Sequence, residues 1–362
     1  MSSSYISPPL TYHYWGMGIK GVNHSDLAAF LVMIRGTEFE PEKEIEYEDD
    51  EGHTGIQTTK MSSYRSKAQS SPTFTDKCRY REGWEDILYC LLGEHTETQV
   101  AGATLAKQYD FFVNPITPKD PPFVTLYNGF AKTTNDAYIY DDCLLNEFEI
   151  SFSNEEAMTY KPTFASNYPE FNQPNPIRVV PDDGVFVKPA DVSVYIAPQG
   201  TLTEDNMEQY RYGCYIEGGL TINNNVENQP CSDDDFGTST KVIGDREAEF
   251  NLTLPWNDKT KRLEYIYMGG AEDATRVTSE NDVKTVWIKC ESGVIEEVNG
   301  EPLRYSTLIK IPEIVLQGAE SPQSGTDAKQ IEITGKIQEN GTESFLTASV
   351  VTDLSALHID DT

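Results

Sequence analysis

The sequence predicts a mainly β fold, arranged as two tandem β-sandwich or barrel domains that each carry one short helix packed on the sheet. Three observations support this prediction. Apolar and polar residues alternate over many short runs, which is the period of a strand with one buried face. Glycine and proline, 25 and 20 of the 362 residues, separate these runs. The order strand, acidic turn, helix and closing strand pair also occurs twice along the chain.

The alternating runs are spread over much of the chain. Four of them are EFEISFS (147–153), DVSVYIA (191–197), EFNLTLP (249–255) and QIEITGKI (330–337). In GLTINNNVENQ (219–229), Leu220 and Ile222 again alternate with polar residues, and Val226 keeps the same parity after three asparagines. Many short strands with turns between them are typical of antiparallel sandwiches and barrels.

Two segments, 83–93 and 255–270, have the period of a helix instead. Their apolar residues recur at spacings of three and four, which places them on one helical face. A glycine ends each helix, at Gly93 and Gly269, where the chain needs a left-handed residue. We expect the helices to dock on their sheets through Trp84, Ile87, Leu88, Leu91, Trp256, Leu263, Ile266 and Tyr267.

An acidic turn ending in glycine precedes each helix, EDDEG at 48–52 and DDDFG at 233–237. Asp tolerates turn geometry and Gly takes a positive φ, so the simplest interpretation is a solvated turn. A calcium loop is a weaker alternative, because the twelve-residue pattern with a closing Glu is missing. The residues of these turns are Glu48, Asp49, Asp50, Glu51, Gly52, Asp233, Asp234, Asp235 and Gly237.

The repeat divides the chain into two domains of similar order. The sequence predicts an N-terminal arm, a first β domain, a proline-rich linker, a second β domain with a polar insertion near 197–212, and a C-terminal extension. The corresponding boundaries are 1–35, 36–170, 171–184, 185–338 and 339–362. The linker is assigned from its prolines, which discourage regular structure.

Charge is the outlying property of the composition. Lys and Arg number 28 against 59 Asp and Glu, a formal net charge of −31. Binding to a phosphate backbone depends on counterion release by Lys and Arg, so this chain is not expected to hold nucleic acid. Solubility alone is the alternative explanation of the acidic excess.

The sequence contains little that indicates catalysis. The five histidines form no metal-ligand spacing, and neither a Gly-x-Ser-x-Gly elbow nor a phosphate-binding glycine loop occurs. An acidic β-sandwich glycosidase with two inward carboxylates stays open as an alternative, although so many acidic residues make such pairs common by chance. We therefore expect no enzymatic activity, no cofactor and no metal site.

The six cysteines are scattered singly, without a Cys-x-x-Cys pair. We expect free, partly buried thiols in a reducing compartment. The first residues show neither a basic nor an apolar segment of a signal peptide, and the longest apolar run, 27–34, is too short to span a bilayer. These features predict a soluble protein made in a cytoplasm and no membrane partner.

This order of elements resembles the tail tube proteins of tailed bacteriophages, in the long form with two tandem tube-type units. The resemblance covers roughly residues 36–337. The stretches that carry it are GTEFEPEKEIEYEDDEGHTG (36–55), GWEDILYCLLGE (83–94), EFEISFSNEEAMTYKPTFAS (147–166), LTINNNVENQ (220–229), TKVIGDREAEFNLTL (240–254) and RLEYIYMG (262–269).

The resemblance implies a structural virion protein, assembled in the host cytoplasm and located in the tail. It implies that the chain binds copies of itself as a trimeric ring with pseudo-sixfold symmetry, that rings stack into a hollow tube, and that the acidic turns lie near ring–ring contacts. Tape measure, tail terminator and baseplate proteins are the other implied partners. DNA would pass without specific binding, along an inner wall that we expect to be net negative. A baseplate or receptor-binding tail component of the same fold is the alternative.

Overall fold

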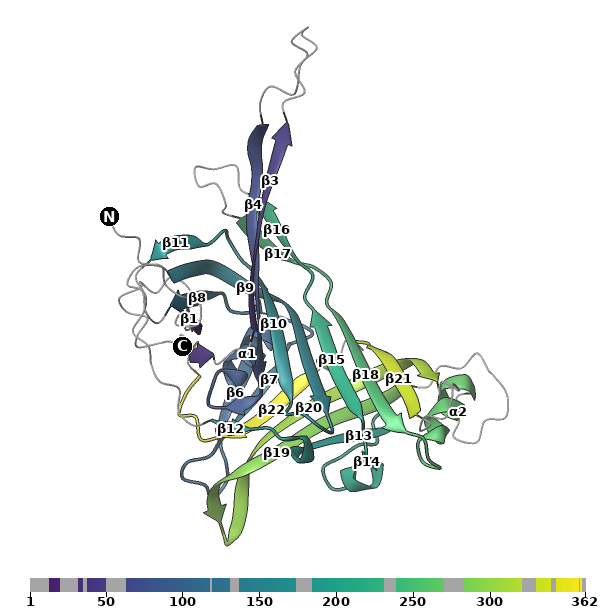
Figure 1. Cartoon of the computed structure of the whole chain (residues 1–362). Helices are drawn as coiled ribbons and strands as arrows, with labels where there is room; N and C mark the ends of the chain where they lie inside the picture. Colours follow the sequence, from purple (N-terminus) through teal and green to yellow (C-terminus); the bar gives the residue numbers. More distant parts are fainter. Residues whose placement is uncertain are drawn as a thin grey trace.

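The computed structural model describes residues 13–19, 32–34, 38–49, 63–117, 119–130, 137–173, 184–230, 239–269, 283–320, 330–339, 343–357 and 359. Strands dominate this part of the chain, every strand pairing in it is antiparallel, and the mainly β prediction is confirmed (Figure 1). Neither helix in the described part combines the length and apolar character that a membrane crossing needs.

The first half of the chain supplies eleven strands and one helix. They are β1 (His13–Ile19), β2 (Val32–Ile34), β3 (Glu38–Asp49), β4 (Ser63–Lys77), β5 (Arg79–Tyr80), α1 (Trp84–Leu92), β6 (Glu94–Gln99), β7 (Lys107–Phe112), β8 (Val124–Phe130), β9 (Ala137–Ser153), β10 (Thr159–Ala165) and β11 (Glu170–Gln173).

The second half supplies a further eleven strands, a second helix and two 3-10 turns. They are β12 (Val185–Phe186), η3 (Pro189–Asp191), β13 (Val192–Pro198), η4 (Met207–Tyr210), β14 (Arg211–Tyr212), β15 (Glu217–Asn223), β16 (Val226–Pro230), β17 (Ser239–Ile243), β18 (Glu247–Pro255), α2 (Lys261–Gly269), β19 (Val283–Val298), β20 (Glu301–Glu320), β21 (Gln330–Ile337) and β22 (Thr347–Thr352).

The two halves pair their strands in the same order. In the first half the rows are β3–β4–β10–β9 and β2–β1–β8–β9–β11. In the second half they are β15–β18–β21–β20 and β14–β13–β19–β20–β22. The long strands β9 and β20, of 17 and 20 residues, belong to both rows of their own half. Each half is therefore a sandwich whose two layers share one long strand.

Strand β15 also pairs with β9, and this pairing joins the halves. The result is one continuous row, β3–β4–β10–β9–β15–β18–β21–β20, which we call the wall. Its core face is apolar across the joint, because Ile150, Leu220 and Phe250 are direct cross-strand partners and all are buried. Burying each such side chain contributes about 1.5–3 kcal/mol, so the joint has the same kind of core as either half.

Helix α1 is set between glycines, as the sequence predicts. Gly83 precedes it at φ 89, and the N–H of Gly93, at φ 82, donates to the carbonyl of Tyr89. These left-handed positions suit a residue without a Cβ. Helix α2 follows a turn in which the Asn257 side chain accepts the N–H groups of Lys259 and Thr260. Both helices end at the glycines that the sequence pattern indicates, whereas α2 begins only at Lys261, after the Asn257 turn and not at the start of the 255–270 segment.

Two segments expected to lie outside the domains, and the expected insertion in the second domain, contribute to the sandwiches. Residues 13–19, expected in an N-terminal arm, form β1 and pair with β8. Residues 347–352, expected in a C-terminal extension, form β22 between β20 and β7. The polar segment 197–212 covers an apolar patch on the outer layer that includes Tyr195 and Trp287. Each segment pairs with a strand edge or covers an apolar face that would otherwise be exposed.

Candidate functional site

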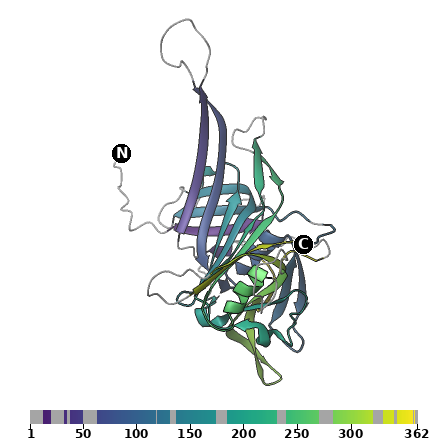
Figure 2. The same ribbon diagram turned by 90° about the vertical axis from the view of Figure 1, so that its right-hand side faces the viewer.

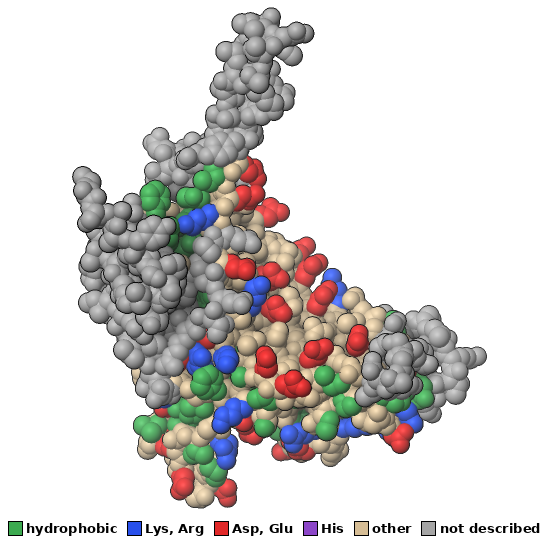
Figure 3. All heavy atoms as spheres, in the orientation of Figure 1, with side chains coloured by type: hydrophobic (Ala, Val, Ile, Leu, Met, Phe, Trp, Pro, Cys, Tyr) green, Lys and Arg blue, Asp and Glu red, His purple; other side chains and the backbone are tan. Residues whose placement is uncertain are grey.

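The face of the wall that points away from the core is acidic. On β9, β15, β18 and β21, each buried apolar residue alternates with an outward polar one. Figure 3 views the molecule from this side and shows many red carboxylates with few blue cations. The outward carboxylates are Glu147, Glu149, Glu217, Glu247, Glu249 and Glu332, and the lysines on the same face of β10 and β21 are Lys161 and Lys336.

The carboxylates of this acidic face are spaced so that few face one another directly. Glu149 and Glu249 stand on strands β9 and β18, with the neutral Thr221 of β15 between them. Their outer cross-strand partners are Lys161 and Lys336. Like charges opposite each other destabilise a sheet, whereas opposite charges contribute a few tenths of a kcal/mol to about 1 kcal/mol. The arrangement keeps a dense negative surface compatible with a stable sheet.

The wall has an open edge at each end. Among the described residues, only β4 pairs with β3, so the outer edge of β3 carries no strand. In the same part of the chain, β20 beyond Val315 pairs with β21 on one side only. Exposed edges are templates for pairing with another chain.

The asparagines at 223–225 end β15 beside the joint between the halves. Asn225 has φ 48, a left-handed conformation that Asn tolerates, and it separates β15 from β16. The side chain of the buried Asn224 donates to the carbonyl of Leu145, and Asn146 Oδ1 accepts the N–H of Val226 at 2.7 Å. The run of asparagines therefore fastens the second half to β9 at the point where the strand turns.

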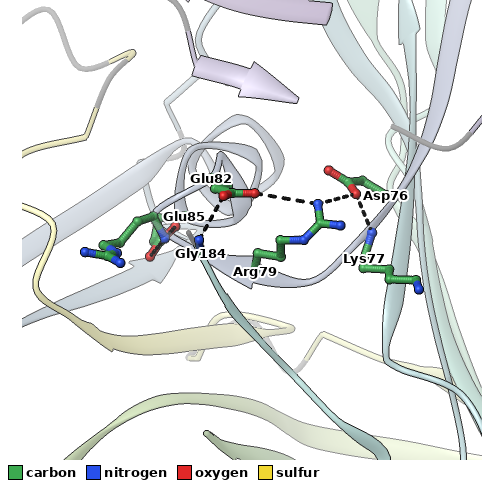
Figure 4. A network of polar contacts seen from close by, with 7 residues as sticks. Asp76, Lys77, Arg79, Glu82, Glu85 and Gly184 are labelled. Atoms are coloured by element: carbon green, nitrogen blue, oxygen red, sulfur yellow. Dashed lines mark hydrogen bonds and ion pairs between the residues drawn. The ribbon is translucent and has the colours of Figure 1, made fainter. Parts of the chain in front are cut away.

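A buried ionic cluster fastens the start of the second half to the first (Figure 4). Arg79 Nη1 lies 2.9 Å from Asp76 and 3.6 Å from Glu82, and all three side chains are buried. Glu82 Oε1 accepts the backbone N–H of Gly184 at 2.9 Å, just before β12 pairs with β5. Removing one partner of such a buried group leaves an uncompensated charge, so the cluster fixes this crossing of the chain.

The end of the second half returns to cover α1. The carbonyl of Leu354 accepts from the Tyr109 hydroxyl at 3.1 Å, and Asp86 Oδ1 accepts the N–H of Ile359 at 3.2 Å. Arg81 pairs with Asp353 at 3.5 Å. Glu85 of α1 is fully buried under this segment, and burial raises the pKa of its carboxyl to about 7.

The predicted turn residues lie mostly outside the described part of the chain. Glu48 and Asp49 are the last residues of β3. Asp50, Glu51 and Gly52 lie outside the described residues, as do Asp233, Asp234, Asp235 and Gly237. The backbone of β3 and β4 extends far from the rest of the wall toward the first of these turns (Figure 1).

The predicted helix-docking residues fall into two groups. Trp84, Ile87, Leu88 and Leu91 of α1 are almost fully buried, as are Leu263 and Ile266 of α2. Trp256 and Tyr267 are only partly buried against the core. The Trp84 ring lies 5.4 Å from that of Tyr160, and its Nε1 donates to Thr307 of the second half at 3.1 Å. The sequence pattern did not indicate this contact across the halves.

Metal-ligating and thiol side chains are the candidates for chemistry among the described residues. In this part of the chain, no group of three or more His, Cys, Asp and Glu side chains is placed to hold a metal ion. Cys78, Cys90, Cys143 and Cys290 are buried free thiols, and Cys214 is exposed. Burial raises the pKa of the Cys290 thiol to about 12, which makes it a poor nucleophile at neutral pH.

A family model described as phage tail tube protein matches residues 54–296 of the chain. The match begins before β4 and ends in β19, so it includes the joint between β9 and β15 and more than half of the residues. No protein with curated annotation matches the sequence.

Proposed function

This chain belongs to the phage tail tube protein family, and from that premise we propose that it polymerises into stacked rings that form a hollow tube for DNA. It is a structural protein of the virion tail in this proposal, assembled in the host cytoplasm and without catalytic activity. Tape measure, terminator and baseplate proteins are its other partners. The repeated strand order further supports two tandem tube-type units in one chain.

The open edges of the wall support the ring. Within the chain, β15 is the first wall strand of the second half, and it pairs with β9 of the first half. Strand β3 is the equivalent first strand of its own half, and residues 316–320 of β20 offer the corresponding free edge. Pairing of β3 in one copy with β20 in the next repeats the internal joint between chains. Such head-to-tail contacts close a ring when the rotation allows, and three copies give six similar positions.

The acidic face of the wall is the single observation that carries the DNA function. In a ring, the walls of neighbouring copies would form a barrel. Their core faces would point outward, toward the second layer of each sandwich, and their acidic faces would line the lumen. Duplex DNA carries one negative charge per about 1.7 Å of axis, so a negative lumen repels it and prevents binding. Screening acts over about 8 Å at physiological salt, so carboxylates near the passing duplex act most strongly.

Charge reversal on the acidic face tests this proposal. Glu147→Lys together with Glu217→Lys is suitable, because the cross-strand partners of both residues are uncharged. We expect virions with this double variant to assemble normal tubes by electron microscopy and to eject DNA several times more slowly, since lumenal lysines bind phosphates.

The matched control reverses two exposed carboxylates outside the acidic face, Asp205→Lys with Glu301→Lys, and should leave ejection unchanged. Equal ejection rates for both double variants would contradict the lumenal role of this face. A wild-type chain that forms single closed rings without tubes would instead indicate a baseplate component, and one that stays monomeric would overturn the proposed assembly.

A further inference from the structure

The outer sides of the two helices differ in a way that the single chain does not explain. Every residue of α1 except Tyr89 is buried, including the charged Glu85 and Asp86. In α2, only Leu263 and Ile266 are buried among the residues with described side chains, and Tyr265 is 37 % exposed. Both helices pack on the long strand of their own half, α1 on β9 and α2 on β20. The difference therefore lies in what covers their outer sides.

The cover of α1 comes from across the joint between the halves. Strand β22 pairs with β20 on one side and with β7 on the other. In the chain after it, the N–H of Ile359 donates to Asp86 of α1, Asp353 pairs with Arg81 just before the helix, and the Leu354 carbonyl accepts from Tyr109 of β7. A segment at the end of the second half thus covers the helix of the first half.

The strand equivalent to β22 in the first half is β11. It follows β10 as β22 follows β21, and it pairs with β9 as β22 pairs with β20. In the described part of the chain β11 pairs with β9 alone, and its Phe171 side chain is 61 % exposed. Figure 1 places β11 and α2 at opposite sides of the molecule, and in Figure 2 α2 faces the viewer.

We propose that the exposed side of α2 is the docking surface for β11 of a second copy of this chain, with Phe171 packed near Tyr265. The contact repeats between chains what β22 and its following segment do to α1 within one chain. This docking surface would lie next to the proposed pairing of β3 with β20 between copies. The inference depends on the proposed ring.

Two single substitutions test the contact, Phe171→Glu on β11 and Tyr265→Glu on α2. Each introduces a charge that must be desolvated if the contact forms, so each should weaken ring association by about tenfold or more. The matched control is Ile116→Glu, which changes an 80 % exposed apolar residue on the loop after β7. Sedimentation velocity should show rings for wild type and control, and smaller species for the two variants. Circular dichroism reports whether each variant is folded.

Cross-linking keeps the test decisive if a variant folds poorly. In a background with Cys214→Ser and Cys231→Ser, chains carrying Phe171→Cys are mixed with chains carrying Tyr265→Cys and treated with a short bis-maleimide. A dimer that forms only in the mixture is the expected result. Rings in which the Phe171→Cys and Tyr265→Cys chains do not cross-link, while both glutamate variants assemble normally, would overturn this contact alone. A wild-type chain that never forms rings would overturn the proposed ring together with it.

Discussion

Helices α1 and α2 have the same length and corresponding places in the two halves, yet α1 is a core element and α2 a partly exposed one. Their local sequences suffice to make each a helix, because the apolar spacing and closing glycine are similar. The burial of α1 depends on a segment more than 250 residues distant in sequence, as the contact of Asp86 with Ile359 shows. Two halves with the same strand order therefore differ in how deeply their helices are buried, because the segment after β22 covers α1 and no equivalent described segment covers α2.

The tryptophans that precede or begin the helices offer the sharpest test of this comparison. Trp84→Ala removes a ring that is 1 % exposed and leaves Thr307 without its indole donor, so we expect a loss of about 3–5 kcal/mol of unfolding free energy. Trp256→Ala is the matched change at the partly buried position before α2, and it should cost less than about 2 kcal/mol. Urea denaturation of the monomeric chain measures both.

Equal losses for Trp84→Ala and Trp256→Ala would contradict the distinction between a core helix and a surface helix. A larger loss at Trp256 would indicate that the chain already self-associates through the side near α2 under the conditions used. Repeating the measurement at several protein concentrations separates these outcomes, because association makes the apparent stability depend on concentration.

Glu85 gives the second test, through pH. Burial raises its pKa to about 7 in the folded chain, against about 4.5 when unfolded. The folded state then binds more protons between these values, so stability is fully present below pH ~4.5 and falls as pH rises through ~7. The shift corresponds to about 3 kcal/mol. Glu85→Gln should remove this fall, so its stability relative to wild type should improve between pH 5 and pH 8.

The matched control for Glu85 is Glu264→Gln, on the half-exposed part of α2. Its effect on stability should differ little between pH 5 and pH 8. If wild type and Glu85→Gln lose stability in parallel over this range, then the C-terminal segment does not bury Glu85 as the structure indicates, and the cover on α1 is looser than described.

The comparison also shows what the sequence alone could predict. Alternation places Leu220 and Ile222 on the core face, and periodicity places both helices, because these signals are local. The acidic face follows from the same alternation once strand order is known, since the carboxylates of β9 and β18 come together only through β15.

Nonlocal pairing is what the sequence could not supply. Nothing local in GWEDILYCLLG distinguishes Glu85 from a solvated helix residue, because its burial depends on the chain after β22. The three asparagines at 223–225 had a recognisable turn composition, yet their partner Leu145 could not be inferred from spacing. The segments assigned to an arm and an extension became β1 and β22 for the same reason.

Glu296 supplies the smallest expected effect and tests a further contact between the halves. It lies near the end of β19, just before the turn to β20. Its carboxylate accepts hydrogen bonds from the N–H groups of Leu105 and Ala106 and from the hydroxyl of Thr104, all in the first half. These hydrogen bonds hold its pKa down to about 2, against about 4.5 when unfolded, so their stabilising contribution is complete above pH ~4.5 and is lost as pH falls toward 2. Because the group is open to solvent, global stability should change little.

The expected consequence of losing the Glu296 contact is local. Glu296→Gln should speed amide hydrogen exchange at Leu105 and Ala106 by about tenfold at pH 7, with other regions unchanged. Wild type should show the same increase between pH 4 and pH 2, relative to intrinsic rates. The neighbouring Glu297→Gln is the control. If exchange at Leu105 and Ala106 does not change in Glu296→Gln, then the Glu296 contact does not stabilise the first half. The halves would then be held together by the wall, the ionic cluster and the C-terminal segment.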